Sequence, residues 1–264
     1  RFILVATPSG ITLAPEGGAH QSIAEPLIGM AQDGLAGFEP GFVDELAVIL
    51  SFALDYIQRD GQRNRDGEAS ERNWLRDETG GSVYLRLSTR PIEQIQREMT
   101  PALRQAIVDG AYWLREPGPN CQVVVAYSGA VAPEAIQAVG LMAEDRRDTG
   151  LLAVTSADRL NAGWTAAWRA RERGLVHARS HIERLFAGLP RHCGIVSVVD
   201  AHPATLGWLG AVGGHRVRPL GVEHFGQTGS IAELYRHYGI DAQAIIAAAE
   251  AIAPGRPIRY LGAA

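Results

Sequence analysis

The most informative absence from this sequence is lysine, because all 25 basic residues of the 264-residue chain are arginines. Without lysine, the chain contains no phosphate-binding loop of the Walker type, no Schiff-base catalyst and no pyridoxal site. An anionic ligand would therefore have to be held by arginine, histidine or backbone N–H groups.

Excess positive charge, long hydrophobic runs and abundant cysteine are missing as well. The formal net charge of -4 argues against a nucleic-acid partner, because phosphate contacts need a basic surface. No apolar run approaches the length of a membrane span and no signal peptide opens the chain, so we expect no membrane association. Cys121 and Cys193 are too few for a disulfide framework, and a reducing cytoplasm fits them best.

The hydrophobic content of 46% indicates a globular protein with a sizeable core, and the length favours two domains. Arg1 leads directly into FILVATPSG, which is typical of a buried strand and lacks a preceding loop. We therefore expect the chain to be a piece or segment of a longer polypeptide.

The first part of the chain mixes strand and helix patterns. Residues 1–10 predict a strand and a turn, and residues 82–90 predict a second strand. Residues 42–59 predict an amphipathic helix whose apolar face carries Val43, Leu46, Leu50, Leu54 and Ile57. The polar residues 61–81 predict a surface excursion. Residues 99–120 combine a short helix with a Pro/Gly-rich exit, and we expect a linker there.

From Cys121 onward, strand and helix patterns alternate. Strands are predicted at 121–129, 150–157, 194–201 and 216–226, each followed by a helix, and Ser230 with Glu233 predicts a capping box before the next helix. Such alternation predicts an α/β fold with a doubly wound, mainly parallel sheet and helices on both faces. Ligands usually bind at the carboxyl ends of strands in sheets of this kind.

Residues 16–23, EGGAHQSI, follow the first predicted strand and place a histidine behind two glycines. Glycine lets a backbone adopt positive φ angles or approach another group closely. Histidine is the side chain that exchanges a proton most readily near neutral pH. Taken alone, the pattern fits either a solvated loop or a proton-transfer site at His20.

Four stretches together resemble the homodimeric bacterial pyruvate dehydrogenase E1 component, a thiamine-diphosphate enzyme of the transketolase superfamily. They are EGGAHQSI, GFEPGFVDELAVIL, GGSVYLRLSTR and LGVEHFGQTGSIAELYRHYGID. In the last stretch, Phe225, Gly226, Thr228 and Gly229 match the superfamily's C-terminal signature.

The resemblance implies three segments: 1–98 as the C-terminal part of a pyrimidine-binding α/β domain, 99–120 as a linker, and 121–264 as a transketolase-like C-terminal domain. The family's Gly-Asp-Gly metal-diphosphate motif is absent, since RDG and QDG occur only in polar loops. The glutamate that contacts the pyrimidine ring would lie upstream of Arg1. The implied cofactors, thiamine diphosphate and Mg²⁺, would therefore be held mainly by residues outside this chain, which we expect to be inactive alone.

By the same resemblance, His20 occupies the position of the family's active-site histidine. Such a histidine can hydrogen-bond to the carbonyl or carboxylate of a 2-oxo acid and supply a proton. Gly17 and Gly18 would let the loop approach cofactor and substrate, while Glu16 and Gln21 would support it. No metal ligand is expected within the chain.

The implied function is decarboxylation of a 2-oxo acid, with pyruvate as the default substrate. The implied partners are a second copy in a homodimer, the upstream part of the E1 polypeptide, and the dihydrolipoyl acyltransferase (E2) whose lipoyl group accepts the acyl product. Two alternatives stay open: a transketolase-type sugar transferase, since AHQ also resembles the transketolase loop, and a non-catalytic dimerisation or docking module.

The remaining candidate residues have simpler interpretations. His177 and His181 have the four-residue spacing of a helical metal pair, but no cysteine or carboxylate clearly completes that site. Asp200 and His202 end a predicted strand, yet the resemblance puts them in the C-terminal domain, away from the thiazolium. Ser128 lacks the Gly-x-Ser-x-Gly pattern of serine hydrolases.

The tryptophans at 164, 168 and 208 have helical spacing and are predicted to be core residues. The charge run over residues 63–77 predicts a solvated surface segment.

Overall fold

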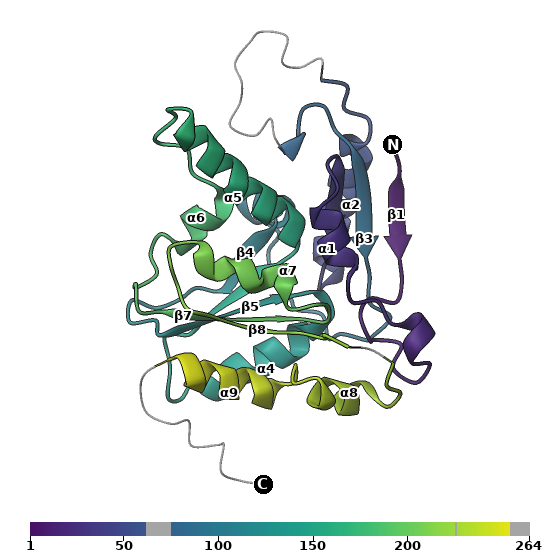
Figure 1. Ribbon diagram of the computed structural model, residues 1–264, viewed down its shortest axis with the longest axis vertical. Helices are drawn as coiled ribbons and strands as arrows, with labels where there is room; N and C mark the ends of the chain where they lie inside the picture. The colour runs from purple at the N-terminus through teal and green to yellow at the C-terminus, as the bar shows by residue number, and fades with distance from the viewer. Residues whose placement is uncertain (62–74, 225, 254–264) are drawn as a thin grey trace.

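The computed structural model describes residues 1–61, 75–224 and 226–253, which form two β-sheets with helices around them (Figure 1). The first sheet is parallel, in the order β1 (Ile3–Ala6), β3 (Ser82–Arg86), β2 (Leu35–Phe38). The second has the order β4 (Ala111–Arg115), β6 (Gly150–Val154), β5 (Val123–Ser128), β7 (Gly194–Val199), β8 (Val217–Leu220). All pairs in it are parallel except β4 with β6.

Helices cover both faces of the second sheet (Figure 1). One face carries α4 (Ala132–Met142), α8 (Ile231–His237) and α9 (Ala242–Ile252), and the other carries α5 (Ala157–Glu172), α6 (His181–Phe186) and α7 (Ala204–Gly207). Ser230 and Glu233 form the predicted capping box at the start of α8. The predicted fold class, α/β with a doubly wound and mainly parallel sheet, is confirmed.

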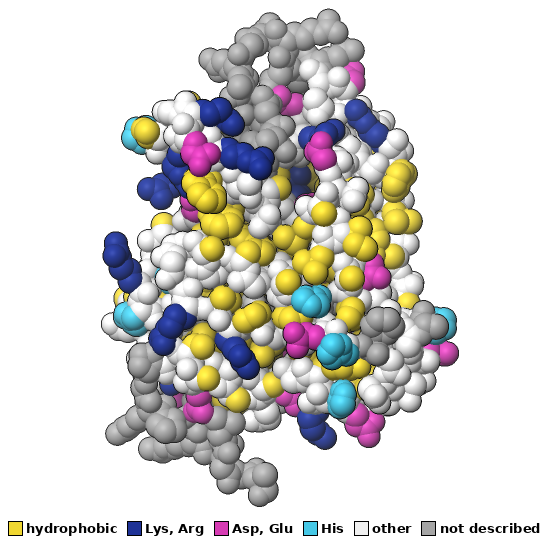
Figure 2. All heavy atoms as spheres, in the orientation of Figure 1, with side chains coloured by type: hydrophobic (Ala, Val, Ile, Leu, Met, Phe, Trp, Pro, Cys, Tyr) yellow, Lys and Arg dark blue, Asp and Glu magenta, His cyan; other side chains and the backbone are white. Residues whose placement is uncertain are grey.

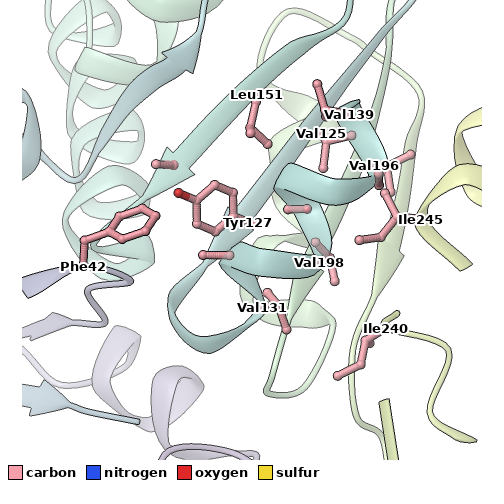
Figure 3. Close-up of a cluster of buried hydrophobic side chains, with 14 of the residues drawn as sticks. Phe42, Val125, Tyr127, Val131, Val139, Leu151, Val196, Val198, Ile240 and Ile245 are labelled. Atoms are coloured by element: carbon pink, nitrogen blue, oxygen red, sulfur yellow. The ribbon is translucent and has the colours of Figure 1, made fainter. Parts of the chain in front are cut away.

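The centre of the second sheet consists of strands whose sequences are continuously apolar. Every residue of β5 and β7 is buried, because helices cover both sides of these central strands. Figure 3 shows Val125 and Tyr127 of β5 beside Val196 and Val198 of β7, with side chains of α4 and α9 against them. The two cysteines, which are free thiols, lie just before these strands with their Sγ atoms 3.6 Å apart.

The expected linker differs from the structure. Residues 99–120 contain α3 (Pro101–Asp109) and β4, and β4 is the antiparallel edge strand of the second sheet. Its sequence, AYWLR, is typical of a strand, but the proline- and glycine-rich residues that follow it favoured a linker over the whole segment. The helix α1 (Glu25–Met30), β2 and α6 were also not predicted.

The helix α2 (Val43–Tyr56) forms where predicted, but its buried face differs from the predicted one. Val48, Ile49, Ala53 and Tyr56 are buried. Of the five residues of the predicted face, Leu46 and Ile57 pack partly buried against the core, whereas Val43, Leu50 and Leu54 are exposed. The helix is apolar on more than one side, so periodicity alone could not identify the side that packs on the sheet.

The strand β1 also exposes apolar side chains. Phe2, Leu4 and Val5 are each at least half exposed, and within the described residues β1 is an edge strand that pairs with β3 alone. Figure 2 shows apolar side chains gathered along the right-hand edge, over β1. Most of the predicted charge run at 63–77 lies outside the described residues. No helix in the described segments is long and apolar enough to cross a membrane.

Candidate functional site

A cavity of about 540 Å³ lies at the end of β1, between this strand, α1 and the turn that carries His20. Its lining residues are Leu4, Ala6, Thr7, Pro8, His20, Gln21, Ser22, Glu25, Ile28, Gly29, Leu35 and Tyr84. Because α/β sheets bind ligands at the carboxyl ends of their parallel strands, this cavity is the candidate functional site.

His20 ends a short 3-10 helix, η1 (Gly18–His20). Its backbone N–H donates a hydrogen bond to the Gly17 carbonyl at 3.0 Å, and Gln21 N–H donates to the Gly18 carbonyl at 3.1 Å. His20 is exposed and also lines the cavity, so its ring can exchange protons with solvent as well as with a bound molecule.

Gly17 is required by packing within the chain. Its φ angle is 71°, in the region that favours glycine, and a Cβ atom there would lie 2.4 Å from Cγ2 of Thr228. At Gly17, the absence of a side chain therefore lets the loop backbone pack closely against the segment before α8. Glu16 is exposed and is not among the residues that line the cavity.

Two further titratable residues line the cavity and were missed from the sequence. Glu25 begins α1, and its Oε2 atom is buried without a hydrogen-bond partner among the described residues. Tyr84 lies on β3, and burial raises the pKa of its hydroxyl. An acid before a proline at a helix start and a tyrosine within a strand are common patterns, so neither residue carries a distinctive signal in the sequence.

Gln21, predicted as loop support, is buried and links the loop to the C-terminal part of the chain. Its Nε2 donates to the Gln227 carbonyl at 2.8 Å, and Gly226 N–H donates to its Oε1 at 2.8 Å. Gly226 and Thr228 of the predicted signature therefore lie against the His20 turn. Phe225 lies outside the described residues.

Asp200, directly after β7, is a second polar residue that joins the His20 turn to the C-terminal part of the chain. Its Oδ1 accepts a hydrogen bond from Ile11 N–H at 3.0 Å, and its Oδ2 accepts one from the Tyr235 hydroxyl at 2.9 Å. Nη2 of Arg86 donates to the carbonyl oxygens of Asp200 and Ser22, both at 2.7 Å. The end of β7 thus contacts the residues on both sides of the His20 turn.

The charged side chains between the His20 turn and the end of β7 are buried. Arg86 is 2% exposed and forms an ion pair with Glu39 through Nη1. Burial raises the pKa of Glu39, and the charge of Arg86 opposes that rise. Burial also raises the pKa of Asp200, to about 6, although Arg86 and the Ile11 N–H favour its charged form.

Two other arginines are also held by internal partners. Arg90 forms two hydrogen bonds with the Glu134 carboxylate, and Arg97 forms two with Asp44. Among the described residues, no arginine lines the cavity. His20 is therefore the cavity residue best suited to contact an anionic group there.

The predicted helical spacing of His177 and His181 is not realised. His177 is exposed in the connection after α5, whereas His181 begins α6 and its Nε2 lies 2.7 Å from the Ala111 carbonyl oxygen. Among the described residues, no group of three or more histidine, cysteine, aspartate and glutamate side chains could hold a metal ion.

Ser128 is buried and donates its hydroxyl proton to the Val154 carbonyl. The three tryptophans stack in sequence, with ring centroids of Trp164 and Trp168 6.3 Å apart and those of Trp164 and Trp208 5.6 Å apart. Trp168 is 55% exposed, so its prediction as a core residue is wrong.

The sequence matches no known protein family and no curated protein. Its fold is similar to that of transketolase from Campylobacter jejuni, with a TM-score of 0.64 and 16% identity over 92% of this chain and 30% of that one. It is likewise similar to transketolase from Leishmania mexicana, with a TM-score of 0.65 and 17% identity over 97% and 31%.

A third similar structure is described as a split-gene transketolase, an inactive β4 tetramer. Its TM-score is 0.57, and its identity is 15% over 95% of this chain and 65% of that one. At these identities, the similarity concerns the fold. The chain spans about 30% of the length of the Campylobacter and Leishmania transketolases.

Proposed function

We propose that this chain is the C-terminal portion of a thiamine-diphosphate-dependent E1 component that decarboxylates a 2-oxo acid, with pyruvate as the first candidate. In this proposal, residues 1–98 belong to the pyrimidine-binding domain and 121–264 form the C-terminal domain. The single observation that carries it is the position of His20, on a glycine-rich turn beside a cavity at the carboxyl end of β1.

The cavity fits the reacting end of such a cofactor. It combines apolar walls at Leu4, Ile28 and Leu35 with a buried Glu25 oxygen that has no hydrogen-bond partner among the described residues. Its described lining contains no arginine, so we expect the diphosphate and its Mg²⁺ to be held by other residues, outside this chain. Thiamine diphosphate, when bound, would supply the carbanion that attacks the 2-oxo acid.

His20 would act on the substrate oxygen. A hydrogen bond from its ring to the carbonyl or carboxylate of the 2-oxo acid would orient the substrate, and the same ring would deliver the proton that the oxygen needs. Its exposure gives it a path for reprotonation from solvent.

The partners are also part of the proposal. The exposed apolar residues of β1 and α2 support the presence of an upstream part of the same domain and a second copy in a homodimer, because such surfaces are rare without a covering partner. The similarity to a split-gene chain described as inactive supports a requirement for a companion domain. The E2 partner rests on the sequence resemblance alone, and a cytoplasmic location on the free cysteines.

A transketolase-type sugar transferase is the second candidate, and the similarity of the fold to transketolases favours it. The two candidates predict different substrates for the assembled enzyme. Pyruvate decarboxylation with an artificial electron acceptor, measured beside pentose-phosphate transfer, separates them. Activity on the sugar phosphates alone would replace the E1 proposal by the second candidate.

The role of His20 is tested by His20→Ala in the assembled enzyme. We expect kcat to fall by roughly 10²–10⁴-fold, the usual contribution of a positioned acid–base group, with the melting temperature and cofactor affinity nearly unchanged. His177→Ala is the matched control, because His177 is also exposed on a connecting segment but does not line the cavity. Wild-type turnover in His20→Ala would reject the assignment of this residue.

A further inference from the structure

We propose that Asp200 and Arg86 are positioning residues that hold both ends of the His20 loop, residues 10–22, against the second sheet. The inference rests on the proposed function, because a fixed position matters only if His20 contacts the reactants. It also gives the C-terminal part of the chain a role at a cavity whose described lining comes entirely from residues 4–84.

The start of the loop is held directly by Asp200. Ile11 N–H donates to Asp200 Oδ1 at 3.0 Å. The adjacent Gly10 lies so close that a Cβ atom there would be 2.2 Å from Cγ of Asp200, and its φ angle of 57° favours glycine. The loop therefore begins in direct contact with the carboxylate, with no room for a side chain between them.

The end of the loop is held through Arg86. One guanidinium nitrogen donates to the Ser22 carbonyl and to the Asp200 carbonyl, both at 2.7 Å, and therefore joins the loop to the end of β7. Ser22 N–H also donates to the Gly10 carbonyl at 2.9 Å, which closes the loop on itself. The ion pair with Glu39 fixes the other arm of Arg86.

Asp200 itself is rigidly held. It is fully buried, and its second carboxylate oxygen accepts a hydrogen bond from Tyr235 of α8 at 2.9 Å. A buried carboxylate with both oxygens bound to fixed donors has little freedom to reorient. Asp200 and Arg86, which together we call the clamp, are therefore fixed in the packed region between the second sheet and α8.

The part of the loop nearest to His20 has few other anchors. Ile11 and Ala14 are buried and secure the first residues, but Pro15, Glu16 and His20 are exposed. The loop's other contacts are the hydrogen bonds of Asp200 and Arg86, those of Gln21 to residues 226 and 227, a hydrogen bond from Gly229 N–H to the Ala14 carbonyl at 3.4 Å, and the close packing of Gly17 on Thr228. Loss of the clamp should consequently loosen the His20 turn more than it loosens the sheets.

The test compares Asp200→Ala and Asp200→Asn by hydrogen–deuterium exchange in the 264-residue chain. Alanine removes both side-chain hydrogen bonds, whereas asparagine can accept from Ile11 N–H through Oδ1 and donate to the Tyr235 oxygen through Nδ2. In Asp200→Ala we expect exchange of peptides from residues 10–22 to rise by about 10- to 100-fold, the effect of one hydrogen bond to a charged group. Asp200→Asn should restore most of the protection.

Ser197→Ala is the matched control, since Ser197 is buried on β7, the strand that directly precedes Asp200, and its hydroxyl has no hydrogen-bond partner among the described residues. It should exchange like wild type. If Asp200→Ala does not fold, Tyr235→Phe removes only the hydroxyl that orients the carboxylate, and a rise in loop exchange there supports the clamp.

Wild-type exchange of residues 10–22 in Asp200→Ala, or in Tyr235→Phe where that variant replaces it, overturns the proposal. So does a loss of protection in Asp200→Asn equal to that in Asp200→Ala, because the hydrogen bonds would then be irrelevant. In the assembled enzyme, the loosened variant should lose kcat with KM for the 2-oxo acid nearly unchanged. A loosened loop with wild-type kcat would support the clamp and count against the proposed role of His20.

Discussion

The replacement Asp158→Asn should stabilise the protein at neutral and alkaline pH. Asp158 lies in the first turn of α5, and its Oδ2 accepts a hydrogen bond from Gly37 N–H of β2 at 2.9 Å, which joins this helix to the first sheet. Although part of the residue reaches the surface, protein atoms enclose the carboxylate, and this burial raises its pKa from 3.8 to about 6. Asparagine keeps an oxygen that can accept the Gly37 hydrogen bond but carries no charge.

The direction of the pH dependence of stability follows from proton binding. Because the pKa is higher in the folded state, the folded protein holds the proton more tightly between pH 3.8 and about 6, and wild-type stability falls as pH rises through this window. The difference between these two pKa values corresponds to about 3 kcal/mol, which is the upper limit of the cost of keeping Asp158 ionised above pH 7. The neutral variant avoids that cost.

Urea unfolding of both proteins at a series of pH values measures this difference. We expect the free energy of unfolding of Asp158→Asn to exceed that of wild type by about 1–3 kcal/mol at pH 8 and by about 0.5 kcal/mol at pH 4. Asp33→Asn is a suitable control, because Asp33 is largely exposed and pairs with Arg76 at the surface. A variant that is less stable than wild type at pH 8 would refute the reasoning. The interactions of the ionised carboxylate would then stabilise the folded state by more than the burial of its charge destabilises it.

Two substitutions test local features of the backbone. Gly110→Ala should destabilise the fold by about 1–3 kcal/mol, because Gly110 has a φ angle of 109° and a Cβ atom there would lie 2.7 Å from the Ser156 carbonyl oxygen; an unchanged urea midpoint would contradict this. Ser230→Ala should cost about 0.5–2 kcal/mol, because it removes the side chain that caps Glu233 N–H at the start of α8. Thermal unfolding followed by circular dichroism measures the second effect, and a melting temperature equal to that of wild type would show that the cap is dispensable.

The sequence by itself determined the elements whose patterns are unambiguous. The apolar runs at β5 and β7 specify central strands, because only a strand covered on both faces buries every side chain. The Ser230–Glu233 spacing specified a helix start, since a cap depends on residues three apart in the chain. His20 was identified as a candidate for a similar reason: the glycines and the histidine are adjacent in the sequence.

Tertiary structure alone decided which contacts these elements make. Neither the pairing of β4 with β6 nor the outward face of α2 can be read from periodicity, because a strand at a sheet edge and a helix that is apolar on several sides each allow more than one packing. The same holds for the site. Glu25 and Tyr84 join His20 only through the cavity, and Asp200 reaches Ile11 across 189 residues of sequence. Contacts between residues so far apart depend on how the two sheets pack, and no local pattern in the chain encodes that packing.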